Sequence, residues 1–401
     1  MSKRSYDIVL FGATGFTGRL TALYLAQKQA EKPFSFALAG RNPQKLAEVQ
    51  AEVRAQSPQA EVALLEARAD DAASLRQMTA QAQVLLTTVG PYAQHGRPLV
   101  EACIDTQTDY LDITGEGNFV TVLLQELDEK ARAQKVRIVN CCGFDSIPAD
   151  FGAYFTIKQL PEATQKIVTI RGYAAFNSGS SNPLASISGG TWHSALNFMR
   201  VPELWRQRGA LQWIDQQAQS QNRRIGQPLA AVHYRSQEGF WGVPLPLIDN
   251  EIVLRSAAGL PEYGRSFYYR HYGQINSLLT LSVGALGITS LFALAQLKPT
   301  RDLLLRLRPS GQGPDEAQRS KNSFEVFFEG RHNDTTIRTR VSGGDPGYGE
   351  TSKMVGESAL CLALDRAQLP ERYGILTPVL AGQDLLLARL QKAGIQFEVV
   401  E

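Results

Sequence analysis

The feature that most constrains the fold lies near the amino terminus, where an apolar run leads directly into three evenly spaced glycines. The run is Tyr6–Phe11, and Gly12, Gly15 and Gly18 follow it as G-x-x-G-x-x-G, ahead of a helical pattern. This order predicts a strand, a tight turn and a helix start. Such a turn lets backbone N–H groups approach a phosphate, and the helix N-terminus adds partial positive charge. Because one glycine motif is weak evidence, a glycine-rich loop without a ligand is the alternative.

A second apolar run, Phe34–Ala39, ends at Gly40, Arg41 and Asn42. In a dinucleotide-binding fold, the end of the second strand faces the adenosine ribose. An acidic residue there accepts from the 2′-hydroxyl of NAD, whereas an arginine pairs with the 2′-phosphate of NADP. This stretch contains Arg41 and no acidic residue, so it predicts NADP(H). The alternative is that Arg41 is only a solvated residue at the start of the next helix.

Two further segments are expected to border the coenzyme. Asp70 follows the third apolar run, where it either caps the next helix or contacts adenine, and Asp71 is expected near that cap. The fourth run ends in Thr88, Val89 and Gly90, at the edge where a doubly wound sheet binds its ligands. The residues expected to bind the coenzyme are Gly12, Ala13, Thr14, Gly15, Phe16, Thr17, Gly18, Arg41, Asn42, Asp70, Thr88, Val89 and Gly90.

Residues 1–150 alternate short apolar runs with helical patterns, which is typical of a parallel sheet covered on both faces. The strands are expected near 6–11, 34–39, 61–65, 83–87, 109–112 and 136–141. The helices are expected near 16–29, 43–55, 72–79, 95–106 and 118–134. The predicted fold class is therefore α/β, with a Rossmann-type doubly wound parallel sheet that binds NADP in residues 1–150.

A different pattern begins near residue 165 and indicates a second, α+β domain over 151–342. Residues 166–173, 323–329 and 335–341 alternate apolar and polar side chains, and the last two are separated by the polar turn 330–334. These runs predict an antiparallel or mixed sheet with one hairpin. Residues 343–401 hold a second glycine-rich turn, a helix over Thr351–Leu364, one more helix and a closing strand, and are expected to return to the first domain.

Composition narrows the class of protein. The formal net charge of the 401 residues is only +2, so nothing global indicates nucleic acid. Between Arg200 and Ser310, however, 13 Lys and Arg stand against 7 Asp and Glu. A basic surface there suits an acidic carrier, an anionic lipid or a phosphorylated substrate, or is simply a solvated face. The first strand begins too early for a signal peptide, and the four cysteines form no metal-binding or disulfide pattern, so we expect a cytoplasmic protein without a metal.

Residues 272–297 contain no charged side chain, and basic residues flank both ends of the segment. The length is enough to span a bilayer, but glycines, serines and threonines interrupt it. Flanking arginines on both sides give a span no preferred orientation. Three possibilities stay open: a core or pocket wall for a greasy substrate, a peripheral contact with an anionic membrane surface, and a membrane span.

The carboxyl ends of the fourth, fifth and sixth predicted strands are expected to meet in one crevice that holds the nicotinamide. Hydride reduction needs placement and a proton source, and three residues are candidate acids: Tyr92, Asp145 and His193. Each has a simpler interpretation. Tyr92 stacks on the nicotinamide, Asp145 caps the helix that follows it, and His193 is a packed or surface histidine.

Several motifs in this order resemble the saccharopine dehydrogenase-like oxidoreductases, above all the branch with the mycobacterial trans-acting enoyl reductases and the animal lipid-droplet homologue. The matching segments are Gly12–Gly18, Ala39–Asn42, Thr88–Tyr92, Asp112–Glu116 and Cys142–Pro148, with 188–191 and 345–349 later in the chain. The resemblance covers nearly the whole chain. It implies an NADP-type domain, a second domain with a mixed sheet, and reduction of a carbon–carbon double bond on a carrier-held acyl chain.

Taken together, the residues and the resemblance predict an NADPH-dependent reductase of an apolar acyl or enoyl substrate in lipid or glycolipid synthesis. One alternative is an NADP-binding protein without turnover that associates with a membrane or lipid through residues 272–297. Another is an imine-reducing, saccharopine-type dehydrogenase, which we rank lower because no arginine pair is placed for an amino-acid dicarboxylate. The chain is expected to bind no nucleic acid, and an oligomer stays open.

Overall fold

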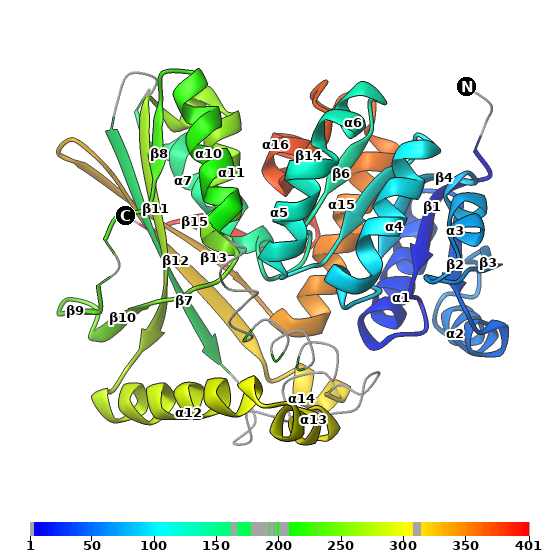
Figure 1. Ribbon diagram of the computed structural model, residues 1–401, viewed down its shortest axis with the longest axis horizontal. Helices are drawn as coiled ribbons and strands as arrows, with labels where there is room; N and C mark the ends of the chain where they lie inside the picture. Colours follow the sequence, from blue (N-terminus) through cyan, green and yellow to red (C-terminus); the bar gives the residue numbers. More distant parts are fainter. Residues whose placement is uncertain are drawn as a thin grey trace. The chain divides into compact units, whose positions relative to one another are not determined.

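The computed structural model describes residues 4–161, 167–177, 208–229, 231–307 and 314–400, together with Trp192, Leu196 and Met199. The chain forms two compact units (Figure 1). The first unit comprises Met1–Phe144 and Gly347–Ala393, and the second comprises Asp145–Pro346 and Gly394–Glu401. Each unit is built around its own sheet, one parallel and one mixed. The predicted fold class is therefore confirmed.

The first unit contains a seven-stranded sheet in the order β14-β6-β5-β4-β1-β2-β3, and every neighbouring pair is parallel. Apart from β14, this is the order of a dinucleotide-binding sheet. Its strands are β1 (Tyr6–Phe11), β2 (Phe36–Gly40), β3 (Val62–Glu66), β4 (Ala82–Thr87), β5 (Asp109–Asp112), β6 (Arg137–Val139) and β14 (Gly374–Leu376). Central strands buried on both faces explain the continuous apolar runs in the sequence.

Helices pack on both faces of this sheet (Figure 1). One group is α1 (Phe16–Glu31), α2 (Pro43–Gln56), α15 (Thr351–Leu364) and α16 (Pro378–Lys392). The other is α3 (Ala72–Thr79), α4 (Tyr92–Asp105), α5 (Gly117–Glu126) and α6 (Asp128–Ala133). The predicted helix over 118–134 is wrong in one respect, because Leu127 leaves the helical conformation and divides it into α5 and α6.

The second unit contains a mixed sheet in the order β15-β13-β12-β7-β11-β10-β9, with β8 also paired to β11. Its strands are β7 (Ile167–Asn177), β8 (Arg224–Gly226), β9 (His233–Arg235), β10 (Phe240–Pro244), β11 (Ser266–Ile275), β12 (Ser323–His332), β13 (Thr335–Gly343) and β15 (Gln396–Val399). The predicted hairpin is confirmed as β12 and β13, although its turn is shorter than expected. Asn333 adopts a left-handed conformation (φ 50°) and lets the strands pair as far as His332.

The described helices of the second unit are α7 (Ile147–Gln159), α10 (Arg208–Ser220), α11 (Asp249–Gly259), α12 (Leu278–Gln296), α13 (Lys298–Arg306) and α14 (Glu316–Arg319). Two shorter turns also occur, η2 (Pro261–Tyr263) in this unit and η3 (Pro346–Glu350) where the chain re-enters the first unit. The C-terminal strand β15 pairs with β13, so the chain end completes the second sheet.

A core or pocket-wall role was one of the three possibilities for the uncharged segment 272–297, and the described side chains do not fit it. Its first residues, Tyr272–Ile275, end β11, and the rest forms α12. Described side chains along α12 are largely exposed, including Leu279 (75%) and Leu286 (70%), while Ala295 packs in a small cluster with Trp192. Within the described residues, we find no helix with the length and hydropathy that a bilayer crossing requires.

Candidate functional site

The glycine turn after β1 has the geometry of a phosphate cradle. Gly12 has a φ of +93°, and a Cβ added there would lie 2.8 Å from Oγ1 of Thr88. A Cβ on Gly18 would lie 2.2 Å from the carbonyl oxygen of Gly12, so α1 approaches the turn more closely than a side chain allows. The N-cap residue of α1, Gly15, offers no side-chain cap. The N-terminus of α1 thus faces the turn without a side-chain cap, and the residues present fit a pyrophosphate.

Two neighbouring segments support this turn. Thr88 donates a hydrogen bond from Oγ1 to the Gly12 carbonyl (3.2 Å), which ties the end of β4 to the turn. The ring of Phe16 meets that of Tyr348 edge-on, with centroids 4.9 Å apart. Tyr348 belongs to the second glycine-rich stretch of the sequence, whose role sequence reasoning had left open. The structure assigns it a place beside the start of α1.

The residues after β2 and β3 lie at the edge that the adenosine ribose would face. Arg41 is exposed and makes no hydrogen bond or ion pair within the described part of the chain. The amide oxygen of Asn42 accepts from the Lys45 N–H (3.0 Å) and caps α2, so this oxygen is committed to the helix. Asp70 does not cap α3, because Asp71 does so by accepting from two N–H groups. The cap expectation for Asp71 is confirmed, and the capping alternative for Asp70 is wrong.

Glu116 shapes the loop that follows β4. Its carboxylate accepts hydrogen bonds from the N–H groups of Tyr92 (3.0 Å) and Ala93 (2.9 Å), the first two residues of α4. The N-cap residue of α4, Pro91, has no side chain able to do this. A buried carboxylate thus caps a helix that begins 24 residues earlier in the chain. No local sequence signal indicates this role, because the partners meet only through the packing of α4 on α5.

Asp112, the last residue of β5, joins the ends of two strands, β5 and β6. Its fully buried carboxylate accepts from Tyr110 Oη (2.8 Å), Asn140 Nδ2 (2.7 Å) and the Cys141 N–H (3.0 Å). Burial raises the pKa of this carboxyl group to about 6, although each of these hydrogen bonds lowers it. Cys141 itself adopts a left-handed conformation (φ 64°), which directs the chain from β6 into the next loop. The network holds the ends of β5 and β6 together.

Tyr92 does not project from this edge. It is buried (6% exposed), its ring packs against Phe119, and its hydroxyl donates to the Thr87 carbonyl at 3.3 Å. Burial first, and then the negative charge of Asp112, raise the pKa of Tyr92 well above its usual value. This environment keeps the phenol of Tyr92 protonated, and its contacts with Phe119 and Thr87 fix the side chain inside the first unit. It favours a positioning role over proton donation.

Asp145, another of the candidate acids, falls in the second unit. Asp145 is exposed and makes no hydrogen bond among the described residues, so the alternative that it caps α7 is wrong. Surrounding protein atoms raise the pKa of its carboxyl group. Asp249 is buried, and burial followed by the charges of Asp145 and Asp150 raises its pKa well above the usual range. His193 lies outside the described residues.

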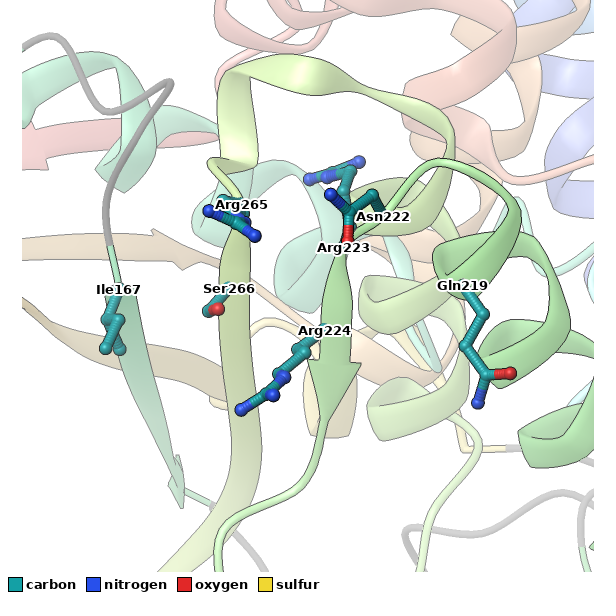
Figure 2. A pocket seen from close by; sticks show the side chains of 7 residues that line it. All are labelled: Ile167, Gln219, Asn222, Arg223, Arg224, Arg265 and Ser266. Atoms are coloured by element: carbon teal, nitrogen blue, oxygen red, sulfur yellow. The ribbon is translucent and has the colours of Figure 1, made fainter.

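The second unit also has a basic pocket of about 590 Å³ (Figure 2). Arg223 is committed to the fold, since it donates to the Ala257 carbonyl (2.7 Å) and the Gly264 carbonyl (2.9 Å). Arg224 and Arg265 are exposed, and their guanidinium groups have no hydrogen-bond or ion-pair partner among the residues that the structure describes. The lining residues are Ile167, Gln219, Asn222, Arg223, Arg224, Arg265 and Ser266. Except for Ile167, the lining residues lie within the basic stretch Arg200–Ser310 of the sequence.

Comparisons with known proteins agree with this geometry. Residues 8–139 match the model of the saccharopine dehydrogenase NADP-binding domain. A Mycobacterium tuberculosis relative, provisionally named a trans-acting enoyl reductase, is 36% identical and the alignment covers 98% of this chain and 97% of its own. The trans-acting enoyl reductase of Mycobacterium ulcerans is 32% identical with the same coverage.

The solved structure of saccharopine dehydrogenase (L-Glu forming) from Saccharomyces cerevisiae matches 99% of this chain and 100% of its own, with a TM-score of 0.55 and 12% identity. This match concerns the fold alone. The family model and the full-length relatives, together with the cradle at Gly12, make the protein an NADP(H)-dependent oxidoreductase. The chain belongs to the saccharopine dehydrogenase-like family, in the branch of the trans-acting enoyl reductases.

Proposed function

We propose that the protein reduces the carbon–carbon double bond of an apolar α,β-unsaturated acyl thioester in lipid or glycolipid synthesis. The observation that carries this proposal is the near full-length similarity to trans-acting enoyl reductases, joined to a turn that fits a dinucleotide pyrophosphate. NADPH, when bound, supplies the hydride and becomes NADP⁺. The hydride goes to the β-carbon of the substrate, and a proton then reaches the α-carbon.

The proton source that we favour is Asp145. Asp145 is an exposed residue, yet burial by the protein atoms around its carboxyl group raises the pKa, so a larger fraction of it carries a proton near neutral pH than of an ordinary aspartate. Tyr92 is proposed to position the loop after β4, because its hydroxyl is hydrogen-bonded to the Thr87 carbonyl. His193 stays a second candidate acid.

The direct test is NADPH oxidation by the purified protein with a set of 2-enoyl thioesters of increasing chain length. A second set pairs amino acids with 2-oxo acids, which are the substrates of an imine-reducing enzyme. Turnover with the thioesters supports the proposal, and Asp145→Asn is then expected to lower kcat by about 100-fold without changing the Kd for NADPH. Binding of NADPH with no turnover on either set would favour the non-catalytic alternative. Turnover with the second set alone would favour imine reduction.

We also propose that α12 makes a peripheral contact with an anionic lipid surface from the cytoplasm. Large leucines exposed on one helix are unusual for a protein surface, and α13 follows directly with Lys298, Arg301 and Arg306. The double variant Leu279→Asp/Leu286→Asp is expected to abolish sedimentation with vesicles containing phosphatidylserine. Leu229→Asp is the matched control, because Leu229 is exposed elsewhere in the same unit. Equal sedimentation of both variants would contradict the contact.

The substrate is proposed to arrive on an acidic carrier protein, and the unpaired arginines of the basic pocket support this. Arg224 and Arg265 offer two positive charges beside the exposed Ile167 (65%). The double charge reversal Arg224→Glu/Arg265→Glu is expected to lower kcat/KM by roughly tenfold for the carrier-bound substrate. The same enoyl group on a short thiol should be reduced as before. An equal effect on both substrates would contradict carrier docking at this pocket.

A further inference from the structure

A second arginine, Arg68, lies beside Arg41 at the carboxyl-terminal ends of the strands. In the paired strands β2 and β3, Gly40 stands opposite Glu66, and the register continues one step further because the Ala67 N–H donates to the Gly40 carbonyl (3.0 Å). Arg41 and Arg68 therefore leave the ends of adjacent parallel strands, which are separated by about 4.8 Å. In this class of sheet the ligand lies beyond that edge.

The side chain of Arg68 is held but not buried. Its Nε and Nη2 donate to the two carboxylate oxygens of Asp70, at 3.2 and 3.1 Å, in a bidentate pair. The two side chains are 55% and 71% exposed. Exposed ion pairs contribute little to stability. The pair with Asp70 therefore orients the Arg68 guanidinium and still leaves it accessible to a ligand.

The surrounding loop does not need this pair. The Arg68 N–H donates to Ser74 Oγ (3.2 Å), and Asp71 caps α3. These bonds set the backbone after β3 without the Arg68 side chain. Arg41 is close enough for its charge to help lower the pKa of Asp70, after the larger effect of Arg68. Two guanidinium groups and one carboxylate consequently share this edge.

We propose that Arg68 is a second residue that reads the 2′-phosphate of NADP(H), acting beside Arg41 and oriented by Asp70. A phosphate monoester carries nearly two negative charges and three acceptor oxygens, so it can take bonds from two guanidinium groups. The carboxylate of Asp70 leaves part of the Arg68 guanidinium, including Nη1, free to donate. NAD(H) has no 2′-phosphate for Arg68 to bind. Arg68 therefore favours NADP(H) over NAD(H). This inference rests on the coenzyme being NADP(H) and not on the enoyl substrate.

The test compares two fragments of the coenzyme by calorimetry: adenosine 2′,5′-bisphosphate and adenosine 5′-monophosphate. Arg68→Ala is expected to weaken binding of the bisphosphate by about tenfold and binding of the monophosphate by less than about twofold. Arg41→Ala shows how much affinity for the bisphosphate is lost when the first arginine is removed, and the Arg68 variants are compared with it. The matched control is Arg76→Ala, because Arg76 is similarly exposed (57%) and pairs with an aspartate, Asp105, in the same unit. Arg68→Gln checks that the loss follows from charge rather than from shortening the side chain.

The proposal is overturned if Arg68→Ala keeps the preference for the bisphosphate while Arg41→Ala loses it. It is also overturned if Arg68→Ala weakens both fragments equally, since that would indicate a contact with adenine or a displaced loop. These outcomes do not depend on turnover with any acyl substrate. Failure of enoyl reduction and failure of this inference are therefore distinguishable.

Discussion

Removing the carboxylate of Glu116 should both destabilise the first unit and weaken coenzyme binding. In Glu116→Ala, the N–H groups of Tyr92, which is buried, and of Ala93, which is only partly screened from solvent, lose a charged acceptor that lies 3.0 and 2.9 Å away. Each charge-assisted hydrogen bond is worth about 1.5–3 kcal/mol. We expect a loss of roughly 3–5 kcal/mol in the free energy of unfolding, after allowing for partial relaxation. Glu116→Gln keeps one acceptor and should lose about half of this.

The coenzyme should respond because the loop between β4 and α4 borders its expected site. When α4 frays, Thr88 is less well held against the glycine turn, and the Kd for NADPH should rise by about tenfold or more. The assays are urea unfolding followed by circular dichroism, amide hydrogen exchange across α4, and NADPH fluorescence titration.

The control is Glu101→Ala on the same helix. Glu101 is partly exposed and pairs with Arg97, so its loss should change the unfolding free energy by less than about 1 kcal/mol. The reasoning is refuted if Glu116→Ala unfolds at the urea concentration of the wild type. The link to the site is refuted if stability falls while the Kd for NADPH is unchanged.

Three other outcomes are expected. Gly18→Ala places a Cβ 2.2 Å from the Gly12 carbonyl and should abolish NADPH binding in a fluorescence titration, and retained affinity would show that the turn can move. The pKa of Asp112 is raised from 3.8 unfolded to about 6 folded, so the folded protein takes up its proton first as the pH falls. Its contribution to stability should accordingly increase by about 2 kcal/mol between pH 7 and pH 4, and Asp112→Asn should lack this increase in urea unfolding, whereas parallel pH curves would contradict it. Tyr92→Phe removes the 3.3 Å bond to the Thr87 carbonyl and should keep kcat within roughly threefold; a 100-fold loss in steady-state assays would make it the acid instead.

The local elements could be predicted well because their signals lie within a few neighbouring residues. Strand β1 and helices α3 and α15 have the predicted bounds. Asp71 caps the helix that its position indicated. Strand β14 was missed, since three residues are too few to show a period. The break at Leu127 was also missed, because no proline or glycine marks it between α5 and α6.

The side chains around the candidate site could be predicted only in part. The glycine turn and Arg41 could be predicted as coenzyme-binding because each directly follows the end of one strand, and the binding role of Arg41 stays a prediction. Arg68 carried the same signal, a basic residue just after a strand, and could have been found. Glu116 could not, because the helix that it caps lies 24 residues away. The three candidate acids remain predictions, with Tyr92 now described as buried.

The amino-acid sequence alone determined the parallel sheet, the dinucleotide turn and the arginine that favours NADP, because strand periodicity, glycine spacing and caps act over short distances. The tertiary structure decided which groups are buried, which are paired and which are left for ligands. In the structure, the carboxylates of Glu116 and Asp112 accept hydrogen bonds from backbone N–H groups, and the described side chains of α12 are largely exposed although the composition of this helix suits a core. Hydrogen bonding and burial depend on partners distant in the chain, and only the folded arrangement supplies those partners.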